Sequence, residues 1–494
     1  MAAASETAPF GLSSTKGIGI GVGGGGGGAG AKPHGHIVTA AGRVHDALVF
    51  AAGAVASVLV LLATASVMPP MPVTNLVSFR SPVTVVTSSS SSSPPLDVHG
   101  VHGGPDAAGR TFYDDPKLSY AVDAVRGESR ITGWDAKRAE WLRLRYPHGM
   151  NSSAAANARV VMVSGSQSPP CRGGGGDHLL LRFLKNKLDY CRLHDRIDLI
   201  YNTALLHPKM LAYWAKIPIV RAAMLAHPDA EWIWWVDADA VLTDMDFTLP
   251  LHKYANHNLV LYGWNREVYD ARSWVGLNAG VFLIRNCQWS LDFMDAWARM
   301  GPGSPEYAKW GKVLKQTLQG KSDEESDDQS ALVYLLSENE EKWGSKAYLE
   351  RDYFFQGYWA VIVDNLDGIA ARYDAFERRR DIPAAKGIRR RHAEREHGRY
   401  AAARNAAARG SIPGPDGGGE SGWRRPFVTH FTGCQPCGGE PNKIYSRKSC
   451  ADGMNRALNF ADDQVLRAYG FRHKDPLSDE VVPLPFDYPA AAGR

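Results

Sequence analysis

The chain has 494 residues, of which 44% are hydrophobic and 10% aromatic, so part of it can bury a large core, whereas 50 Gly and 29 Pro indicate that another part cannot. Its 56 Lys and Arg are nearly balanced by 52 Asp and Glu, which gives a formal net charge of only +4. This balance argues against a nucleic-acid-binding protein, and the basic runs Arg378–Arg380 and Arg389–Arg391 are interpreted as a solvated helix surface.

Two segments near the N-terminus have compositions typical of disorder. Residues 1–46 contain Gly17–Gly30, which is almost all glycine and lacks the preceding strand and following helix of a phosphate-binding loop. Residues 69–110 contain Ser88–Ser93 and few large apolar side chains, so they cannot bury enough surface to offset their chain entropy. We predict a disordered tail and a flexible stem.

A long apolar run lies between these segments. Ala47–Met68 carries no charge and is about as long as the ~20 residues that cross a bilayer. Lys16, Lys32 and Arg43 precede it, whereas the first charge after it is Arg80, so the short N-terminal side is expected to stay cytoplasmic. A cleaved signal peptide is the alternative, but its apolar region has about 7–15 residues. The pattern favours an uncleaved signal anchor, with the remaining chain in a lumen.

The cysteines and the glycosylation sequon fit a lumenal compartment. Asn151 opens an Asn-Ser-Ser sequon, and all the cysteines follow the apolar run, where disulfides persist. Cys434 and Cys437 form a Cys-x-x-Cys pair with no second pair at zinc-site spacing, so we predict structural disulfide bonding, with Cys450 as a further candidate. The pairing does not follow from the sequence. The cysteines are Cys171, Cys191, Cys287, Cys434, Cys437 and Cys450.

Residues 111–488 are predicted to form one α/β domain with a mostly parallel sheet. Short apolar runs predict strands, and apolar residues at helical spacing predict helices between them. Asp177 suits the N-cap of the first helix, and Pro218 is tolerated in the first turn of the second. An insert at about 384–422 is expected to be peripheral. The predicted strands are Arg159–Ser164, Ile197–Tyr201 and Trp232–Val236, and the predicted helices are 177–194 and Tyr213–His227.

Asp237 and Asp239 directly follow the apolar strand Trp232–Val236. In an extended chain, residues two apart face the same side, so both carboxylates could point at one ligand. Two buried like charges need a compensating cation, and Mg²⁺ or Mn²⁺ prefers oxygen ligands and bridges carboxylates to diphosphates. A strand-ending turn without a metal is the alternative. Asp244 and Asp246 have the same spacing without such a strand before them, and are predicted to form a turn.

Four stretches of sequence carry a family resemblance over about residues 111–488. They read HPKMLAYWAKIPIVRAAMLAHPDAEWIWWVDADAVLTDMDF, LNAGVFLIRNCQWSLDFMDAW, SDDQSALVYLL and FVTHFTGCQPC. The chain resembles plant glycosyltransferase family 34, retaining enzymes with a GT-A (Rossmann-like) fold that include xyloglucan xylosyltransferases and galactomannan galactosyltransferases. The resemblance implies a Golgi membrane protein of type II, dependent on Mn²⁺ or Mg²⁺, that uses a UDP-sugar.

The resemblance also implies roles for individual residues. Asp237, Asp239 and His430 would hold the metal, although a buried core histidine is the alternative for His430. Asp327, Asp328 and Gln329 would lie near the reacting sugar. The alternative is that the aspartates of this segment cap the helix that follows. Lys216 would contact the donor together with Arg221, unless both are solvated helix charges. The implied donor-binding residues are Gly165, Lys216, Asp237, Asp239, Asn278 and Gly280.

Gln435 departs from the xylosyltransferase pattern. A lysine stands between the two cysteines in those enzymes, and glutamine supplies no positive charge to a diphosphate. This difference and the LPFDYP tail favour the galactosyltransferase branch, with UDP-galactose as donor and a mannan acceptor. UDP-xylose with a glucan acceptor is the alternative. A further alternative is a non-catalytic scaffold subunit, which would assemble with other Golgi transferases as a homo- or hetero-oligomer. The aromatic cluster Tyr353–Trp359 could stack on sugar rings but is more typical of a core.

Overall fold

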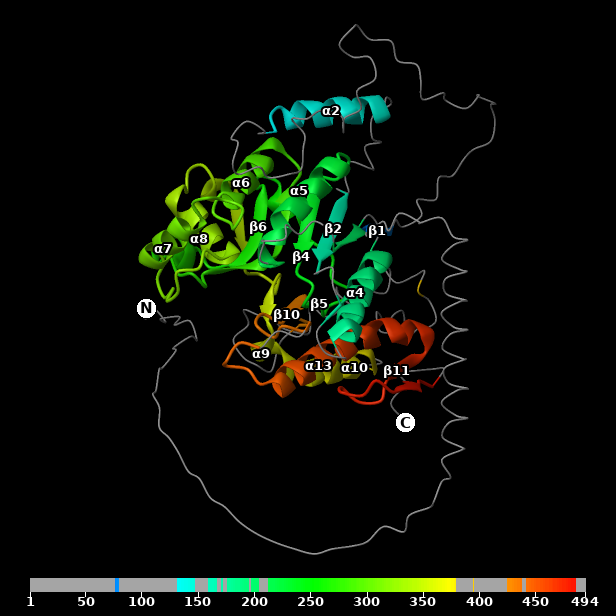
Figure 1. Cartoon of the computed structure of the whole chain (residues 1–494). Coiled ribbons are helices and arrows are strands. Elements are labelled where there is room, and N and C mark those ends of the chain that lie inside the picture. Colours follow the sequence, from blue (N-terminus) through cyan, green and yellow to red (C-terminus); the bar gives the residue numbers. More distant parts are fainter. Residues whose placement is uncertain are drawn as a thin grey trace, which may run out of the picture. The chain divides into compact units, whose positions relative to one another are not determined.

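The computed structural model describes part of the chain, which is coloured in Figure 1. The chain divides into two compact units, Met1–Val73 and Thr74–Arg494, and every described residue belongs to the second. The tail, the apolar run Ala47–Met68, the sequon Asn151 and nearly all of the insert lie outside the described residues. Among the helices that are described, none has the length and apolarity required to cross a membrane. The described residues are 76–79, 131–146, 159–166, 170–171, 176–194, 197–203, 212–378, 394, 424–437 and 441–485.

A seven-stranded sheet forms the centre of the described domain, in the order β1-β3-β2-β4-β7-β6-β8. β3, β2, β4, β6 and β8 point the same way, whereas β7 and the edge strand β1 run antiparallel to them. This arrangement confirms the predicted α/β class with a mostly parallel sheet. The strands are β1 (Leu76–Phe79), β2 (Val160–Gly165), β3 (Ile197–Asn202), β4 (Trp232–Val236), β6 (Leu259–Gly263), β7 (Leu277–Arg285) and β8 (Ala347–Glu350).

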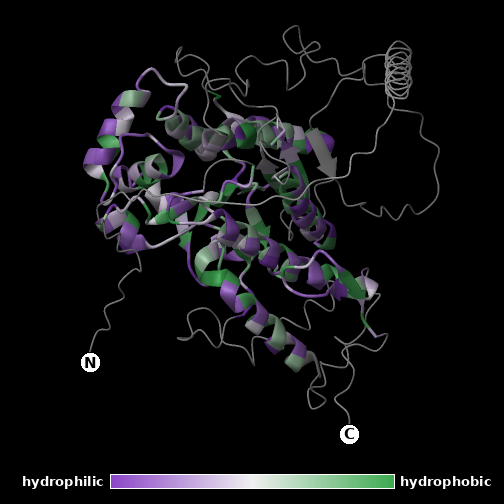
Figure 2. Cartoon of the chain, turned by 60° about the horizontal axis from the view of Figure 1, so that its bottom comes forward, coloured by the Kyte–Doolittle hydropathy of each residue, from purple (hydrophilic) through white to green (hydrophobic). Residues whose placement is uncertain are grey.

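Helices cover both faces of the sheet because alternate residues of the inner strands are apolar on both sides. In β4, Ile233 and Trp235 join one hydrophobic cluster, while Trp232, Trp234 and Val236 join the other. Helices carry both hydrophobic and hydrophilic residues in Figure 2, as amphipathic packing requires. The first cluster includes residues of α5 (Lys216–Ala226), α6 (Gln288–Ala298) and α8 (Asp328–Glu338), and the second those of α4 (Gly176–Leu193), α10 (Leu366–Arg378) and α13 (Arg447–Leu466).

The remaining described helices are short or peripheral. α2 (Trp134–Arg145) is anchored by the Trp134 indole, which donates to Asn286 Oδ1 at 2.8 Å. α7 (Tyr307–Thr317) precedes α8, and α9 (Trp359–Ile362) contacts β10.

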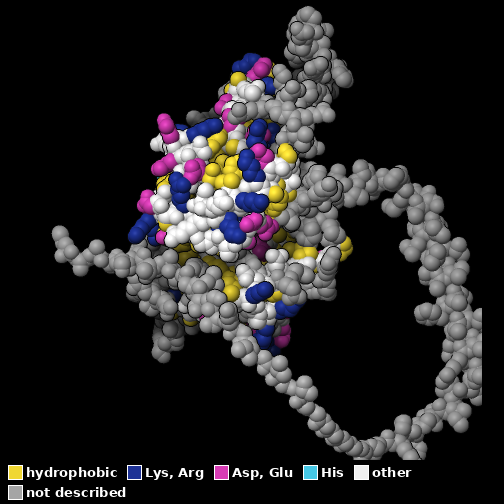
Figure 3. Space-filling view, turned by 60° about the vertical axis from the view of Figure 1, so that its left-hand side comes forward, with side chains coloured by type: hydrophobic (Ala, Val, Ile, Leu, Met, Phe, Trp, Pro, Cys, Tyr) yellow, Lys and Arg dark blue, Asp and Glu magenta, His cyan; other side chains and the backbone are white. Residues whose placement is uncertain are grey.

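Acidic and basic side chains are interspersed on the face shown in Figure 3, which reflects the balanced composition.

A second, three-stranded sheet brings distant parts of the sequence together. β10 (Val428–His430) pairs antiparallel with β5 (Ala240–Leu242) and parallel with β9 (Gly357–Tyr358). In this register His430 lies opposite Ala240, immediately after the Asp237-Ala238-Asp239 segment. The Phe431 amide also donates to the Asp239 carbonyl at 3.1 Å. β5 and β10 lie between the central sheet and α13 in Figure 1. The small sheet therefore positions a histidine against two carboxylates.

The structure differs from the sequence-based prediction in three local features. The helix expected from Tyr213 begins as a 3₁₀ turn (Ala212–Ala215), and the α-helix starts at Lys216, which places Pro218 in its first turn. Asp177 lies inside α4, where its carboxylate accepts a hydrogen bond from the Cys171 amide at 2.9 Å rather than serving as the N-cap. β1 lies within the range assigned to a flexible stem and pairs with β3.

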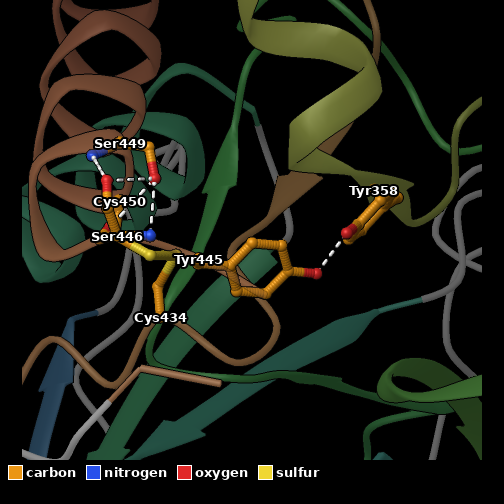
Figure 4. Close-up of a disulfide and its surroundings, with 6 residues drawn as sticks. All are labelled: Tyr358, Cys434, Tyr445, Ser446, Ser449 and Cys450. Atoms are coloured by element: carbon orange, nitrogen blue, oxygen red, sulfur yellow. Dashed lines mark hydrogen bonds between the residues drawn. A yellow bond between two sulfur atoms is a disulfide. The ribbon is translucent and has the colours of Figure 1, made fainter. Parts of the chain in front are cut away.

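Two disulfides hold the loop that follows β10. Cys434 is bonded to Cys450 on α13, and Cys437 is bonded to Cys171, which precedes α4. The Cys-x-x-Cys pair is therefore structural, as predicted, but its two members bond to distant partners rather than to each other. Figure 4 shows the Cys434–Cys450 bond beside the capping box formed by Ser446 and Ser449 at the start of α13.

Removing the Cys434–Cys450 bond is expected to destabilise the domain measurably. The bond closes a 16-residue separation, and a disulfide across a loop of that length stabilises by about 3 kcal/mol in the chain-entropy account. We expect the double variant Cys434→Ser/Cys450→Ser to unfold at lower urea concentration than wild type. Cys287→Ser, at a half-buried free cysteine, is the matched control. An unchanged midpoint in the double variant would contradict the prediction.

The C-terminal hairpin carries a pH-dependent contact to α13. β11 (Phe471–His473) pairs with β12 (Val481–Pro483), and His473 Nε2 lies 3.1 Å from Asp462 Oδ2. Burial alone lowers the pKa of His473, but the hydrogen bond to Asp462 and the charges of Asp463 and Asp462 raise it overall. Burial raises the pKa of Asp462, but its hydrogen bonds to His473 and Lys185 lower it overall.

We therefore expect the His473–Asp462 contact to stabilise the domain only within a pH window. Its contribution is complete below the unfolded histidine pKa of about 6.5 and is lost as pH rises through the raised folded pKa. It is also lost in acid, as pH falls through the lowered pKa of Asp462. His473→Gln should reduce the free energy of unfolding by about 1 kcal/mol near pH 6, and by less near pH 9. Urea titrations at both pH values measure this difference, and equal losses at both would contradict it.

Candidate functional site

The end of β4 turns sharply and carries two carboxylates. The Ala240 amide donates to the Asp237 carbonyl at 3.1 Å, so Asp237–Ala240 is a tight turn rather than the extended segment assumed from the spacing. The carboxylates nevertheless converge. One ligand atom from each of Asp237, Asp239 and His430 lies within 4.8 Å of the other two, a spacing that suits one divalent cation.

His430 faces the carboxylates with one ring nitrogen and the protein with the other. Its Nε2 lies 3.6 Å from Asp237 Oδ2 and 3.2 Å from Asp239 Oδ1. Its Nδ1 lies 3.1 Å from Thr432 Oγ1 and 3.2 Å from Gln356 Nε2. In the tautomer that a metal ligand needs, Nδ1 is protonated and donates to Thr432 Oγ1, and the lone pair of Nε2 faces the carboxylates. Gln356 Nε2, which can only donate, bonds Nδ1 in the other tautomer.

The charges of this cluster are interdependent. Burial disfavours the charged forms of Asp239 and His430, but the attraction and hydrogen bond between them lower the pKa of Asp239 and raise that of His430. Two carboxylates facing one imidazole form an acidic, oxygen-rich site, and a hard divalent cation could replace the imidazole proton there. The three side chains thus fit the predicted metal ion.

Gly280 lies against this cluster because β7 pairs with β4 in a register that places Val281 opposite Val236. On its other side β7 is irregular. The register with β6 jumps from Leu261 opposite Phe282 to Tyr262 opposite Asn278. The Gly280 amide donates to Asn278 Oδ1 at 2.7 Å, and its carbonyl accepts from the Asp237 amide at 2.8 Å. A Cβ at this position would lie only 2.2 Å from His430 Cε1 and 2.7 Å from Asp237 Oδ2. Glycine is therefore required for the close approach.

Lys216 connects the Asp237–Ala240 turn, called the carboxylate turn below, to α8. The side chain is 2% exposed, and its Nζ lies 2.6 Å from Asp328 Oδ2 and 3.5 Å from Asp237 Oδ1. Burial lowers the pKa of Lys216, but these carboxylates raise it overall, whereas burial raises the pKa of Asp328 despite the lysine. Arg221 is likewise only 3% exposed. The alternative that Lys216 and Arg221 are solvated helix charges is wrong.

The Asp327-Asp328-Gln329 segment lies at the start of α8, and Asp327 takes the predicted capping role. Asp327 is the N-cap of α8 and accepts from the Ser330 amide at 2.7 Å. Asp328 instead pairs with Lys216, and Gln329 Oε1 lies 3.4 Å from Asn278 Nδ2. The capping role belongs to Asp327, while Asp328 and Gln329 contact the residues around the carboxylate turn.

Other predicted residues have structural explanations. At Gly165 an added Cβ would lie 2.5 Å from the Asn202 carbonyl oxygen, so close strand packing accounts for this glycine. Asp246 pairs with buried Arg425 at 2.8 Å, which makes the second Asp-x-Asp segment structural. It does follow a strand, β5, contrary to the prediction. Gln435 has a left-handed φ of 52° between the two bonded cysteines.

The aromatic cluster belongs mainly to the core. Phe355 and Trp359 are buried in the hydrophobic cluster that includes α4 and α13. The Tyr358 hydroxyl hydrogen-bonds the Tyr445 hydroxyl, as drawn in Figure 4. The core interpretation therefore holds for Phe355 and Trp359.

Sequence reasoning missed two residues that contact the carboxylate turn. The Trp235 indole donates to Asp237 Oδ1 at 2.5 Å. Lys187 on α4 is fully buried and donates to the carbonyls of Ala238 and Ala240. Burial lowers the pKa of Lys187 to about 7, although Asp239 and Asp237 oppose the shift. A signal was present, because Lys187 lies at helical spacing from Phe183, Tyr190 and Cys191 on the apolar face of α4.

Known proteins resemble the chain across this whole region. Residues 156–441 match the galactosyl transferase GMA12/MNN10 family, glycosyltransferase family 34. The chain is 76% identical to "Probable glycosyltransferase 6" of Oryza sativa subsp. indica over 99% of this chain and 100% of that protein. It is 61% identical to "Probable glycosyltransferase 7" of the same plant over 81% and 86% of the two chains. It is 52% identical to "Galactomannan galactosyltransferase 1" of Cyamopsis tetragonoloba over 79% and 83%.

The family match covers the whole candidate site. Strand β4, the carboxylate turn, Lys216, the start of α8 and His430 all lie within residues 156–441. The identity to full-length relatives extends over most of the chain. The chain therefore belongs to the galactosyl transferase GMA12/MNN10 family and is a glycosyltransferase of family 34.

Proposed function

We propose that the protein transfers galactose from UDP-galactose to a β-linked mannan, with a divalent cation, Mn²⁺ or Mg²⁺, at Asp237, Asp239 and His430. The convergence of these three side chains at the end of β4 is the observation that carries the proposal. The carboxyl ends of strands are where ligands bind in open α/β sheets. A cation held there would offset the negative charge that develops on the UDP leaving group.

The surrounding residues of the chain suit the donor. Lys216 holds a positive charge between Asp237 and Asp328, so it fixes the carboxylates and favours an anionic ligand nearby. Asn278 and Gln329 lie beside this cluster and offer amide groups to sugar hydroxyls. Asp328 could stabilise the positive charge that develops at the anomeric carbon. Transfer is proposed to retain the anomeric configuration, with the departing phosphate oxygen accepting the proton of the incoming hydroxyl.

The identity to a protein named galactomannan galactosyltransferase supports galactose as the sugar and mannan as the acceptor. Gln435 supports the same choice, because the lysine of the xylosyltransferases is absent there. UDP-xylose with a glucan acceptor is the second candidate, since one hydroxymethyl group separates the two donors. The lack of a charge at Gln435 also leaves the non-catalytic scaffold as an outcome that experiment must address.

Purified full-length protein in detergent tests the proposal. It is incubated with Mn²⁺, with UDP-galactose or UDP-xylose, and with manno- or gluco-oligosaccharides, and the products are separated by mass and anomeric configuration. We expect α-galactosylated manno-oligosaccharide that disappears on chelation of the metal. Xylosylated gluco-oligosaccharide would support the second candidate, an inverted anomer would refute retention, and no product from folded protein would support the scaffold.

We further propose that Ala47–Met68 anchors the protein in the Golgi membrane with residues 69–494 in the lumen. Its charge-free length and the basic residues before it support this orientation. Protease treatment of sealed Golgi vesicles should leave the catalytic domain intact until detergent is added. Digestion without detergent would refute the orientation.

A further inference from the structure

The carboxylate turn rests on α4 through two adjacent side chains. Lys187 Nζ lies 2.8 Å from the Ala240 carbonyl oxygen and 3.2 Å from that of Ala238. Asn186 donates to the Leu242 carbonyl at 3.0 Å and accepts from the Leu242 amide at 2.8 Å. These contacts attach both the turn and the following strand β5 to one long helix.

Lys187 is unusual because its partners are neutral. Its side chain is completely buried, and within the described part of the chain both hydrogen bonds of its ammonium go to backbone carbonyl oxygens rather than to a carboxylate. Burying a lysine without a bonded carboxylate is costly. A methionine would fill a similar volume without burying an amine, but it would leave the carbonyls of Ala238 and Ala240 without this donor. The lysine therefore serves the conformation of the turn rather than the packing of the core.

The two carbonyls bonded by Lys187 belong to the residues on either side of a proposed metal ligand. Ala238 and Ala240 flank Asp239, so the hydrogen bonds fix the peptide groups on both sides of that residue. They leave the Asp239 side chain pointing toward His430 Nε2, 3.2 Å away. The Asp237 carboxylate is fixed separately by the Trp235 indole.

We infer that Lys187 is a positioning residue for the metal site, which holds the Asp237–Ala240 turn in the conformation that directs both carboxylates at His430. The inference rests on the proposed metal-dependent function. Lys187 would touch neither metal nor donor, so its effect should appear in metal affinity rather than in the chemical step. Groups that orient metal ligands typically contribute about 10–100-fold to metal affinity.

Lys187→Met in the full-length protein tests the inference, with Lys185→Met as the matched control. Lys185 lies on the same helix, but its half-exposed side chain pairs with Asp189 and Asp462, away from the turn. Mn²⁺ binding is measured by the loss of the free-ion electron paramagnetic resonance signal in the presence of UDP, and folding by circular dichroism. We expect Lys187→Met to raise the Mn²⁺ dissociation constant by about 10–100-fold and Lys185→Met to leave it unchanged.

Kinetics separate positioning from a general structural role. For Lys187→Met, the Mn²⁺ concentration at half-maximal rate should rise with the dissociation constant, while kcat at saturating Mn²⁺ stays within about threefold of wild type. A folded variant with wild-type Mn²⁺ affinity and only a lower melting temperature would overturn the inference. If Lys187→Met does not fold, Lys187→Arg keeps the donors but misplaces them, and wild-type affinity in that variant would overturn it equally. Failure of the wild-type protein itself to bind Mn²⁺ would overturn the proposed function as well.

Discussion

Asp239→Asn is expected to abolish both metal binding and sugar transfer, with kcat/KM falling by about 10³-fold or more. The amide keeps the shape of the side chain but removes a charge that faces His430 Nε2 at 3.2 Å. It also offers an N–H₂ group where a cation needs an oxygen ligand. Mn²⁺ binding and the initial rate with UDP-galactose measure the effect, and the rate should not recover at high Mn²⁺.

The second Asp-x-Asp segment supplies the matched control for this prediction. Asp244 also follows a strand, β5, but its carboxylate lies beside Arg425 rather than His430. The charged groups of Asp244 and Arg425 are 3.8 Å apart. Asp244→Asn should therefore lower stability slightly and leave the Mn²⁺ dissociation constant unchanged. Equal losses of Mn²⁺ affinity in the two variants would show that general destabilisation, not a lost ligand, explains Asp239→Asn.

The local elements could be predicted because their signals are local. The continuous apolar run WIWWV predicts a strand buried on both faces, and the structure has β4 at Trp232–Val236. The apolar periodicity after Asp177 likewise predicts α4, to within a residue at its start. The carboxylate pair was recognisable as a candidate because it follows such a strand. Its conformation was not, since spacing alone does not separate a turn from an extended chain.

Long-range contacts account for what the sequence left open. Nothing near His430 in the sequence indicates that β10 pairs with β5, yet that pairing alone brings the imidazole to the carboxylates. Family resemblance suggested His430, whereas residue chemistry by itself favoured a core histidine. The disulfide partners were also unpredictable, because Cys171 and Cys437 are 266 residues apart. Lys187 was missed because a single lysine on an apolar helix face has no motif.

Gly280→Ala is expected to have an effect out of proportion to one methyl group. The new Cβ would lie 2.2 Å from His430 Cε1, a separation that no real contact allows, so His430 or β7 must move. Gln356 and Thr432 hold the far side of the imidazole and oppose its displacement. We expect the rate with UDP-galactose to fall by about 10²-fold or more, and the free energy of unfolding to fall by about 1–3 kcal/mol.

The two losses can be separated because they have different causes. Gly303→Ala is the control, since a Cβ at Gly303 meets nothing within 4 Å, and its rate should match wild type. Overpacking in Gly280→Ala acts through the distance between His430 and the carboxylates, so Mn²⁺ affinity should fall with the rate. If Mn²⁺ affinity stayed at the wild-type value while the rate fell, Gly280 would instead limit the space for the donor sugar. In that case the metal ligands could shift together, and the rigidity proposed for the Lys187-supported turn would be wrong.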